Sequence, residues 1–76
     1  MQKKSRIVID PRIMGGKPVI RGTRVPVQVI VGALAGGMTV EKVCKEYRVT
    51  SEDVQAALAY AADALAEEKV HALPRR

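Results

Sequence analysis

The chain has no Phe and no Trp, and Tyr47 and Tyr60 are its two aromatic residues. So few aromatics argue against a protein that reads single-stranded RNA by stacking bases on side chains. The single cysteine, Cys44, allows no disulfide within the chain, and with one histidine, His71, it cannot complete a four-ligand zinc site. The uninterrupted apolar run at 29–35 has seven residues, whereas a bilayer requires about 18–20. Disulfide-stapled, zinc-binding and membrane-spanning classes are therefore not expected.

The chain is short, and its first residues do not form a recognisable secretory leader. Its 76 residues are enough for a single domain over residues 1–76, and a core of this size supplies about 3–5 kcal/mol. The basic start MQKK is not followed by a long apolar segment, which argues against a signal peptide. A lone reduced thiol without an export signal is typical of the cytoplasm, so we expect a cytoplasmic protein with no membrane partner.

Residues with reactive side chains are too sparse for catalysis. Cys44 has no base near it in the sequence and falls on the apolar face of a helix, which indicates core packing. His71 stands alone near the end of the chain and fits a surface or partner contact. The run at 15–18 (GGKP) has proline where a phosphate-binding loop needs a hydroxyl residue. We expect no enzyme, no cofactor, no metal and no small-molecule substrate.

Basic residues are concentrated in the first half of the chain. Residues 1–38 hold seven Lys or Arg and one acid, whereas residues 39–76 hold six and seven. Such an excess suits a phosphate backbone or an acidic partner, although it also serves solubility. Arg24 has two interpretations: a fork of hydrogen bonds that ties strand to helix, or a phosphate contact. Three other cations of this half are predicted to be exposed and free to contact DNA: Arg12, Lys17 and Arg21.

A basic strand and turn segment is predicted over residues 1–25. The β-branched runs at 7–9 and 19–20 predict two short strands, with a Gly- and Pro-rich turn between them. Strands this short are weak as an independent sheet. Gly22 is expected to adopt a backbone conformation closed to other residues, and Thr23 is expected to bond to local backbone groups.

Apolar periodicity predicts a helical bundle over residues 26–69. Pro26 fits the first position of a first helix, which ends at the glycine pair 36–37. Thr39 is the predicted N-cap of a second helix of about eight residues. Each helix carries apolar residues on one face, which the spacing predicts to be buried: Val27, Ile30, Val31 and Leu34 in the first, and Val40, Val43, Cys44 and Tyr47 in the second.

A long third helix is predicted from Ser51 to about Lys69. Thr50 and Asp53 have the spacing of a capping box at its start, with Asp in place of Glu. Residues 70–76 are predicted to be either a frayed helix end or a tail that docks on a partner. The apolar spacing predicts a buried stripe of four residues on this helix: Val54, Leu58, Ala61 and Leu65.

The second and third helices and the short turn between them fit a helix-turn-helix at about residues 40–60. Arg48 stands where such turns usually have glycine, and a positive φ there costs about 1 kcal/mol. Carboxylates at 52 and 53 repel phosphates, so base contacts are left to Ser51 and Gln55. Phosphate contacts are predicted for three residues of the flanking helix and turn: Lys42, Lys45 and Arg48. The same elements also fit a three-helix core that binds no DNA.

The stretch GGKPVIRGTRVPV at 15–27 is a specific motif. Read with IDP at 9–11 and GMTVEKV at 37–43, it resembles the Domain of Unknown Function 433 family, over roughly residues 6–65. The resemblance implies a mainly α fold in which short N-terminal β-strands precede a three-helix, homeodomain-like helix-turn-helix. It also implies the antitoxin of a type II toxin–antitoxin system, which neutralises a PIN-like ribonuclease toxin and represses its own operon by binding DNA. Two other functions stay open: a protein-interaction module without DNA binding, and a stand-alone DNA-binding regulator without a toxin.

Two protein partners are expected. The small core and the short strands, which could complete each other's sheet across a two-fold axis, predict a homodimer. The end of the long helix and the tail are predicted to bind the cognate PIN-like toxin through six residues: Leu65, Lys69, Val70, Leu73, Arg75 and Arg76. The alternative is that Leu65 closes the domain core and that residues 70–76 have no partner.

Overall fold

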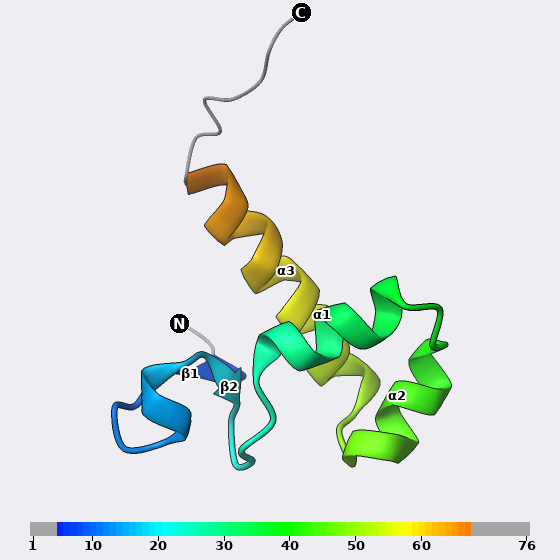
Figure 1. Ribbon diagram of the computed structural model, residues 1–76, viewed down its shortest axis with the longest axis horizontal. Coiled ribbons are helices and arrows are strands. Elements are labelled where there is room, and N and C mark those ends of the chain that lie inside the picture. Colours follow the sequence, from blue (N-terminus) through cyan, green and yellow to red (C-terminus); the bar gives the residue numbers. More distant parts are fainter. Residues whose placement is uncertain (1–4, 68–76) are drawn as a thin grey trace, which may run out of the picture.

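The computed structural model describes residues 5–67, which form three helices and a small sheet (Figure 1). Two strands and a 3-10 turn come first: β1 (Ile7–Val8), η1 (Met14–Gly16) and β2 (Val19–Ile20). Three α-helices follow: α1 (Val27–Ala35), α2 (Val40–Tyr47) and α3 (Ser51–Glu67). The prediction of a mainly helical fold behind short N-terminal strands is confirmed.

The two strands pair with each other in antiparallel orientation. Ile7 lies opposite Ile20, and Val8 lies opposite Val19. The second edge of β2 is also used within the chain, because the Ile20 N–H donates to the carbonyl of Val25 at 2.9 Å. The first strand is one residue shorter than predicted, since Ile9 turns outward ahead of the turn that follows it and is mostly exposed.

A tight turn carries the chain from β2 toward α1. Gly22 has φ 81°, the left-handed region that glycine enters without steric cost. The hydroxyl of Thr23 donates to the Ile20 carbonyl at 2.8 Å and accepts from the Val25 N–H at 2.9 Å. Both predictions for this turn are confirmed.

The boundaries of the first two helices follow local sequence signals. Pro26 was predicted to be the first helical residue, but it precedes α1 as an extended N-cap, because its backbone pairs with Val19 of β2. Gly37 adopts φ 104° beyond the end of α1. The hydroxyl of Thr39 accepts from the Lys42 N–H at 3.1 Å, which confirms Thr39 as the N-cap of α2.

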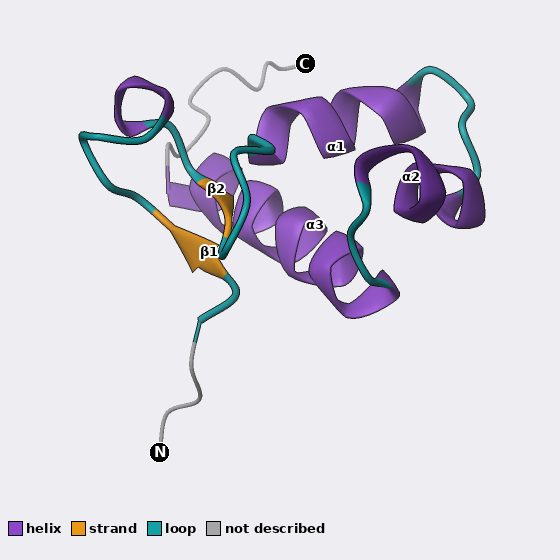
Figure 2. Cartoon of the chain, turned by 90° about the horizontal axis from the view of Figure 1, so that it is seen from below, coloured by secondary structure: helices purple, strands orange, loops and turns teal. Residues whose placement is uncertain are grey.

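The core lies where α1 crosses the first half of α3, with α2 packed against both (Figures 1 and 2). Ile30 of α1 and Val43 of α2 are fully buried. The same cluster contains five more buried side chains, from β2, α1, the turn after α2, and α3: Ile20, Val27, Val49, Val54 and Ala57. Burial of the branched side chains among them is the main stabilising contribution, at about 1.5–3 kcal/mol each.

Three predicted core residues are exposed instead. Leu58 and Leu65 of α3 are 42% and 63% exposed, and Val40 at the start of α2 is 43% exposed. The short helix α1 covers only the first half of α3, and the second half extends past it (Figure 1). In the second half of α3, Ala61 is half-buried beside α1 and Leu65 is mostly exposed, so within residues 5–67 the periodic stripe is buried at its beginning and open at its end.

Several predictions concern the ends of the chain, outside the described residues. Lys69 and the tail at 70–76 fall there, and with them Val70, His71, Leu73, Arg75 and Arg76. Between residues 5 and 67, no helix combines the length and the apolar character that crossing a bilayer demands.

Candidate nucleic-acid interface

The unit α2–turn–α3 has the form of a helix-turn-helix. Arg48 ends α2 in the left-handed conformation, with φ 59° and ψ 47°, as its place in the turn predicts. Val49 is buried and fills the angle between the two helices. The left-handed backbone of Arg48 costs about 1 kcal/mol of stability relative to glycine. In return the turn carries an exposed arginine.

A reciprocal capping box begins α3. The Asp53 N–H donates to the hydroxyl of Thr50, and the Thr50 N–H donates to the carboxylate of Asp53, both at 3.0 Å. The guanidinium of Arg6, which lies just ahead of β1, also donates to this carboxylate at 3.1 Å. Sequence reasoning missed Arg6, because the pair spans 47 positions and no local pattern signals it.

The ion pair changes the electrostatics at the start of α3. The Asp53 side chain is only 14% exposed. Burial raises the pKa of Asp53, but the hydrogen bonds from the Thr50 backbone and from Arg6 outweigh that effect and leave the pKa below 3.8. Of the two carboxylates predicted to repel phosphates, one is thus neutralised, and Glu52 remains exposed.

We expect Asp53→Asn to lower the free energy of unfolding by about 1 kcal/mol at pH 7, since it weakens the helix cap and removes the ion pair with the half-exposed Arg6. A carboxylate with a lowered folded pKa stabilises the fold above its unfolded pKa, here 3.8, and that stabilisation disappears as pH falls through the folded value. Urea unfolding should therefore show the difference at pH 7 and a shrinking difference as the pH falls below 3.8. The exposed Glu46→Gln serves as control, and a difference that stays constant as the pH falls below 3.8 would contradict this account.

Three residues predicted to contact DNA line neighbouring hollows, and two more, Arg48 at the end of α2 and Gln55 one turn beyond Ser51, are close to them in sequence. Lys45 and Ser51 line the same shallow hollow between α2 and α3, and Lys42 lines a second hollow beside Lys45. All five side chains are exposed. We call this set the helix-turn-helix surface: Lys42, Lys45, Arg48, Ser51 and Gln55. One acid, Glu41, lines both hollows among them.

The predicted DNA contacts from the first half of the chain lie elsewhere. The segment from β1 to β2 is on the opposite side of α1 from α2, as Figures 1 and 2 both show. Arg12, predicted to be free, makes a bidentate ion pair with Asp10 at 2.9 and 3.0 Å, and this pairing lowers the pKa of Asp10. The Arg21 guanidinium, also predicted to be free, donates to the carbonyl of Ser5 at 2.7 Å. The spacing Asp-x-Arg could have signalled the first of these bonds.

The remaining two cations of this half are exposed. Lys17 and Arg24 have no hydrogen-bond partner within residues 5–67, so the fork of bonds considered for Arg24 does not form there. The nine predicted DNA contacts thus separate into a set of five around α2 and four dispersed residues near the small sheet. The described part of the chain also contains no cluster of three or more His, Cys, Asp or Glu side chains suited to a metal ion.

Comparisons with known proteins give related sequences and folds. The family model described as "Protein of unknown function (DUF433)" matches residues 7–61. A crystal structure of a DUF433 member from Anabaena variabilis superposes with a TM-score of 0.74 at 33% identity, over 79% of this chain and 60% of that one. The crystal structure of Rv2018 from Mycobacterium tuberculosis superposes with a TM-score of 0.65 at 37% identity, over 71% of this chain and 25% of that one.

A curated sequence relative is also similar over most of the chain. The uncharacterized protein y4eO of Sinorhizobium fredii is 38% identical over 56 residues, which make up 72% of this chain. The chain spans about a quarter of the length of y4eO and of Rv2018. The family match covers both strands and all of α1 and α2, together with the first eleven residues of α3. The chain therefore belongs to the DUF433 family.

Proposed function

We propose that the protein binds duplex DNA through the helix-turn-helix surface, as the autorepressing antitoxin of a type II toxin–antitoxin system. The observation that carries the DNA part is that Lys42 and Lys45 line neighbouring hollows beside the exposed start of α3, with Arg48 exposed in the turn between the two helices. It acts in the cytoplasm as a regulator and not as an enzyme. A helix-turn-helix places the first turns of its second helix in the major groove.

Each part of this surface has a separate task in the proposal. Gln55 and Ser51 lie on the exposed face of the first two turns of α3 and contact base edges, where the glutamine amide suits adenine. The three cations contact phosphates on either side of that groove and set the register. The pairing of Arg6 with Asp53 removes one charge that would repel the duplex.

The toxin part of the proposal is supported by the resemblance of residues 15–27 to the DUF433 family. The helix-turn-helix surface does not bear on it. Of the six residues predicted for the contact with a PIN-like toxin, Leu65 lies within the described part of α3, and we assign the contact to the five beyond it: Lys69, Val70, Leu73, Arg75 and Arg76. An acidic, metal-dependent nuclease site would attract the two terminal arginines.

Fluorescence anisotropy with the duplex upstream of the protein's own coding region tests the DNA part. If three phosphates are neutralised, the plot of log affinity against log salt should have a slope of about −2.7, at about −0.9 per contact. Co-expression with the product of the adjacent reading frame tests the toxin part. Toxin binding without DNA binding indicates a protein-interaction module, and DNA binding without a toxin indicates a stand-alone regulator. If neither occurs, the proposal is wrong.

A further inference from the structure

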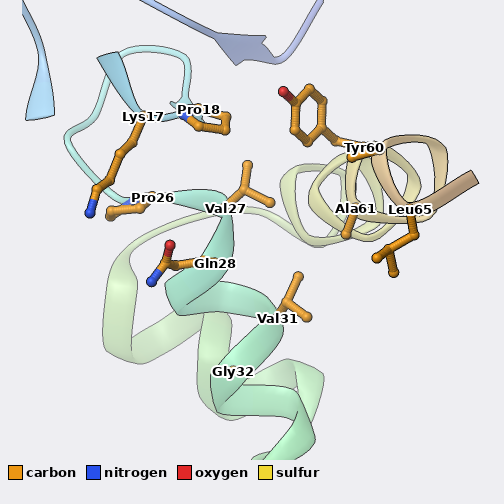
Figure 3. Close-up of a pocket in the computed structure, with 11 residues that line it drawn as sticks. Lys17, Pro18, Pro26, Val27, Gln28, Val31, Gly32, Tyr60, Ala61 and Leu65 are labelled. Carbon is orange, nitrogen blue, oxygen red and sulfur yellow. The ribbon is translucent and has the colours of Figure 1, made fainter. Parts of the chain in front are cut away.

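An apolar groove of about 430 Å³ lies between α1 and the second half of α3 (Figure 3). Val27 and Val31 of α1 form one wall, and Ala61 and Leu65 of α3 form the other. The groove continues the face of α3 that is buried in the core through Val54 and Ala57. The helix-turn-helix surface has no residue in it, so the groove is a separate feature of the molecule.

Gly32, in the middle of α1, also lines this groove. Glycine within a helix costs about 0.5–1 kcal/mol relative to alanine. Gly32 has ordinary helical geometry, and a Cβ added there would meet nothing within 4 Å. Neither the backbone nor the packing of the described chain needs glycine at this position. The missing side chain does, however, allow another molecule to approach α1 closely.

We infer that this groove is a self-association surface, and that it is occupied by the second half of α3 from a second copy of the chain. The α3 helix supplies a projecting side chain, Leu65, which is 63% exposed. Its neighbours in the groove are small, Ala61 and Ala64, and Gly32 lies on the facing helix. In a two-fold interface the same surface of both copies meets, so that surface must carry both a projecting side chain and a recess that receives it. Here Leu65 is the projection, and the space beside Gly32 is the recess.

Charge complementarity favours the same occupant. Helix α3 contains four acids and no Lys or Arg, and two of the acids, Asp63 and Glu67, lie along its second half beside the groove. Lys17, which is exposed, also lines the groove, on the side away from Leu65 in Figure 3. When the second half of α3 from another copy enters the groove, its acidic edge meets this lysine. A basic or uncharged peptide would not gain that attraction.

The two exposed leucines of α3 give a matched pair of variants for the full chain. Leu65 lines the groove, whereas Leu58 is similarly exposed and does not. We expect sedimentation equilibrium at micromolar concentration to show a dimer for the unchanged chain and for Leu58→Lys. Leu65→Lys should be a monomer, with a helix content in circular dichroism equal to that of the unchanged chain.

A second variant fills the space beside Gly32 and leaves the projecting Leu65 unchanged. Gly32→Met adds a side chain to open space and raises helix propensity, so it should fold normally and sediment as a monomer. Charge reversal adds a third readout: Lys17→Glu should weaken the dimer, and adding Asp63→Lys and Glu67→Lys should restore it.

A monomer for the unchanged chain overturns the inference, as does a dimer that survives both Leu65→Lys and Gly32→Met. Because neither residue belongs to the helix-turn-helix surface, DNA binding measured in parallel separates a failure of this inference from a failure of the proposed function. If the unchanged chain is dimeric but pairs through its strands, as the sequence analysis predicts, both groove variants remain dimeric.

Discussion

Replacing Ile30 with alanine is expected to remove most of the free energy of unfolding of the protein at 25 °C. Ile30 has no exposed surface and packs in the cluster shared by α1, α2 and α3. Removing its outer carbons costs about 2–5 kcal/mol, because the lost burial is compounded by a cavity. The net stability of so small a domain is about 3–5 kcal/mol, so this one substitution removes most of the margin.

Circular dichroism with urea titration at a fixed protein concentration measures this effect, since any association between copies adds to apparent stability. Val29→Ala in the same helix is the control, because Val29 is partly exposed and lies outside the core cluster. It should cost less than about 1 kcal/mol. A cooperative transition for Ile30→Ala within 1 kcal/mol of the unchanged chain would show that the core does not depend on this contact.

Removing two lysines from the helix-turn-helix surface should abolish most DNA binding. In Lys42→Ala/Lys45→Ala, each lost charged hydrogen bond costs about 1.5 kcal/mol, or roughly tenfold in affinity. The affinity should therefore fall about a hundredfold, and the salt slope should become shallower by about 1.8. Both side chains are exposed on α2, so the fold should be retained.

The matched control, Arg12→Ala/Arg24→Ala, removes the same charge from the N-terminal segment. Counting charges along the chain favours that segment as the DNA contact, since it holds most of the excess. The structure favours α2, because Arg12 is paired with Asp10 and the segment from β1 to β2 lies away from α2, at the other end of α1. If the control pair loses as much affinity and as much salt slope as the lysine pair, the duplex lies on the small sheet instead.

The local features of this protein follow from its sequence alone. Thr39 caps α2, Thr50 and Asp53 begin α3, and Arg48 takes a positive φ, all as their neighbours predict. Each depends on contacts within about four residues, where side-chain chemistry and backbone geometry leave few alternatives. The mainly helical fold and the family follow in the same way from periodicity and from the motif at 15–27.

Only the tertiary structure decides which apolar side chains stay exposed and which charged side chains form ion pairs. Periodicity places Leu58 and Leu65 on the same side of α3 as the core residues, but both are exposed, and Leu65 lies in the half of α3 that extends past α1. The ion pair of Arg6 with Asp53 joins residues 47 positions apart, and the folding of β1 against α3 sets it. A helical pattern determines which face of a helix is apolar, whereas the length and crossing of its neighbours determine how much of that face is buried. That difference leaves the groove beside Leu65 open.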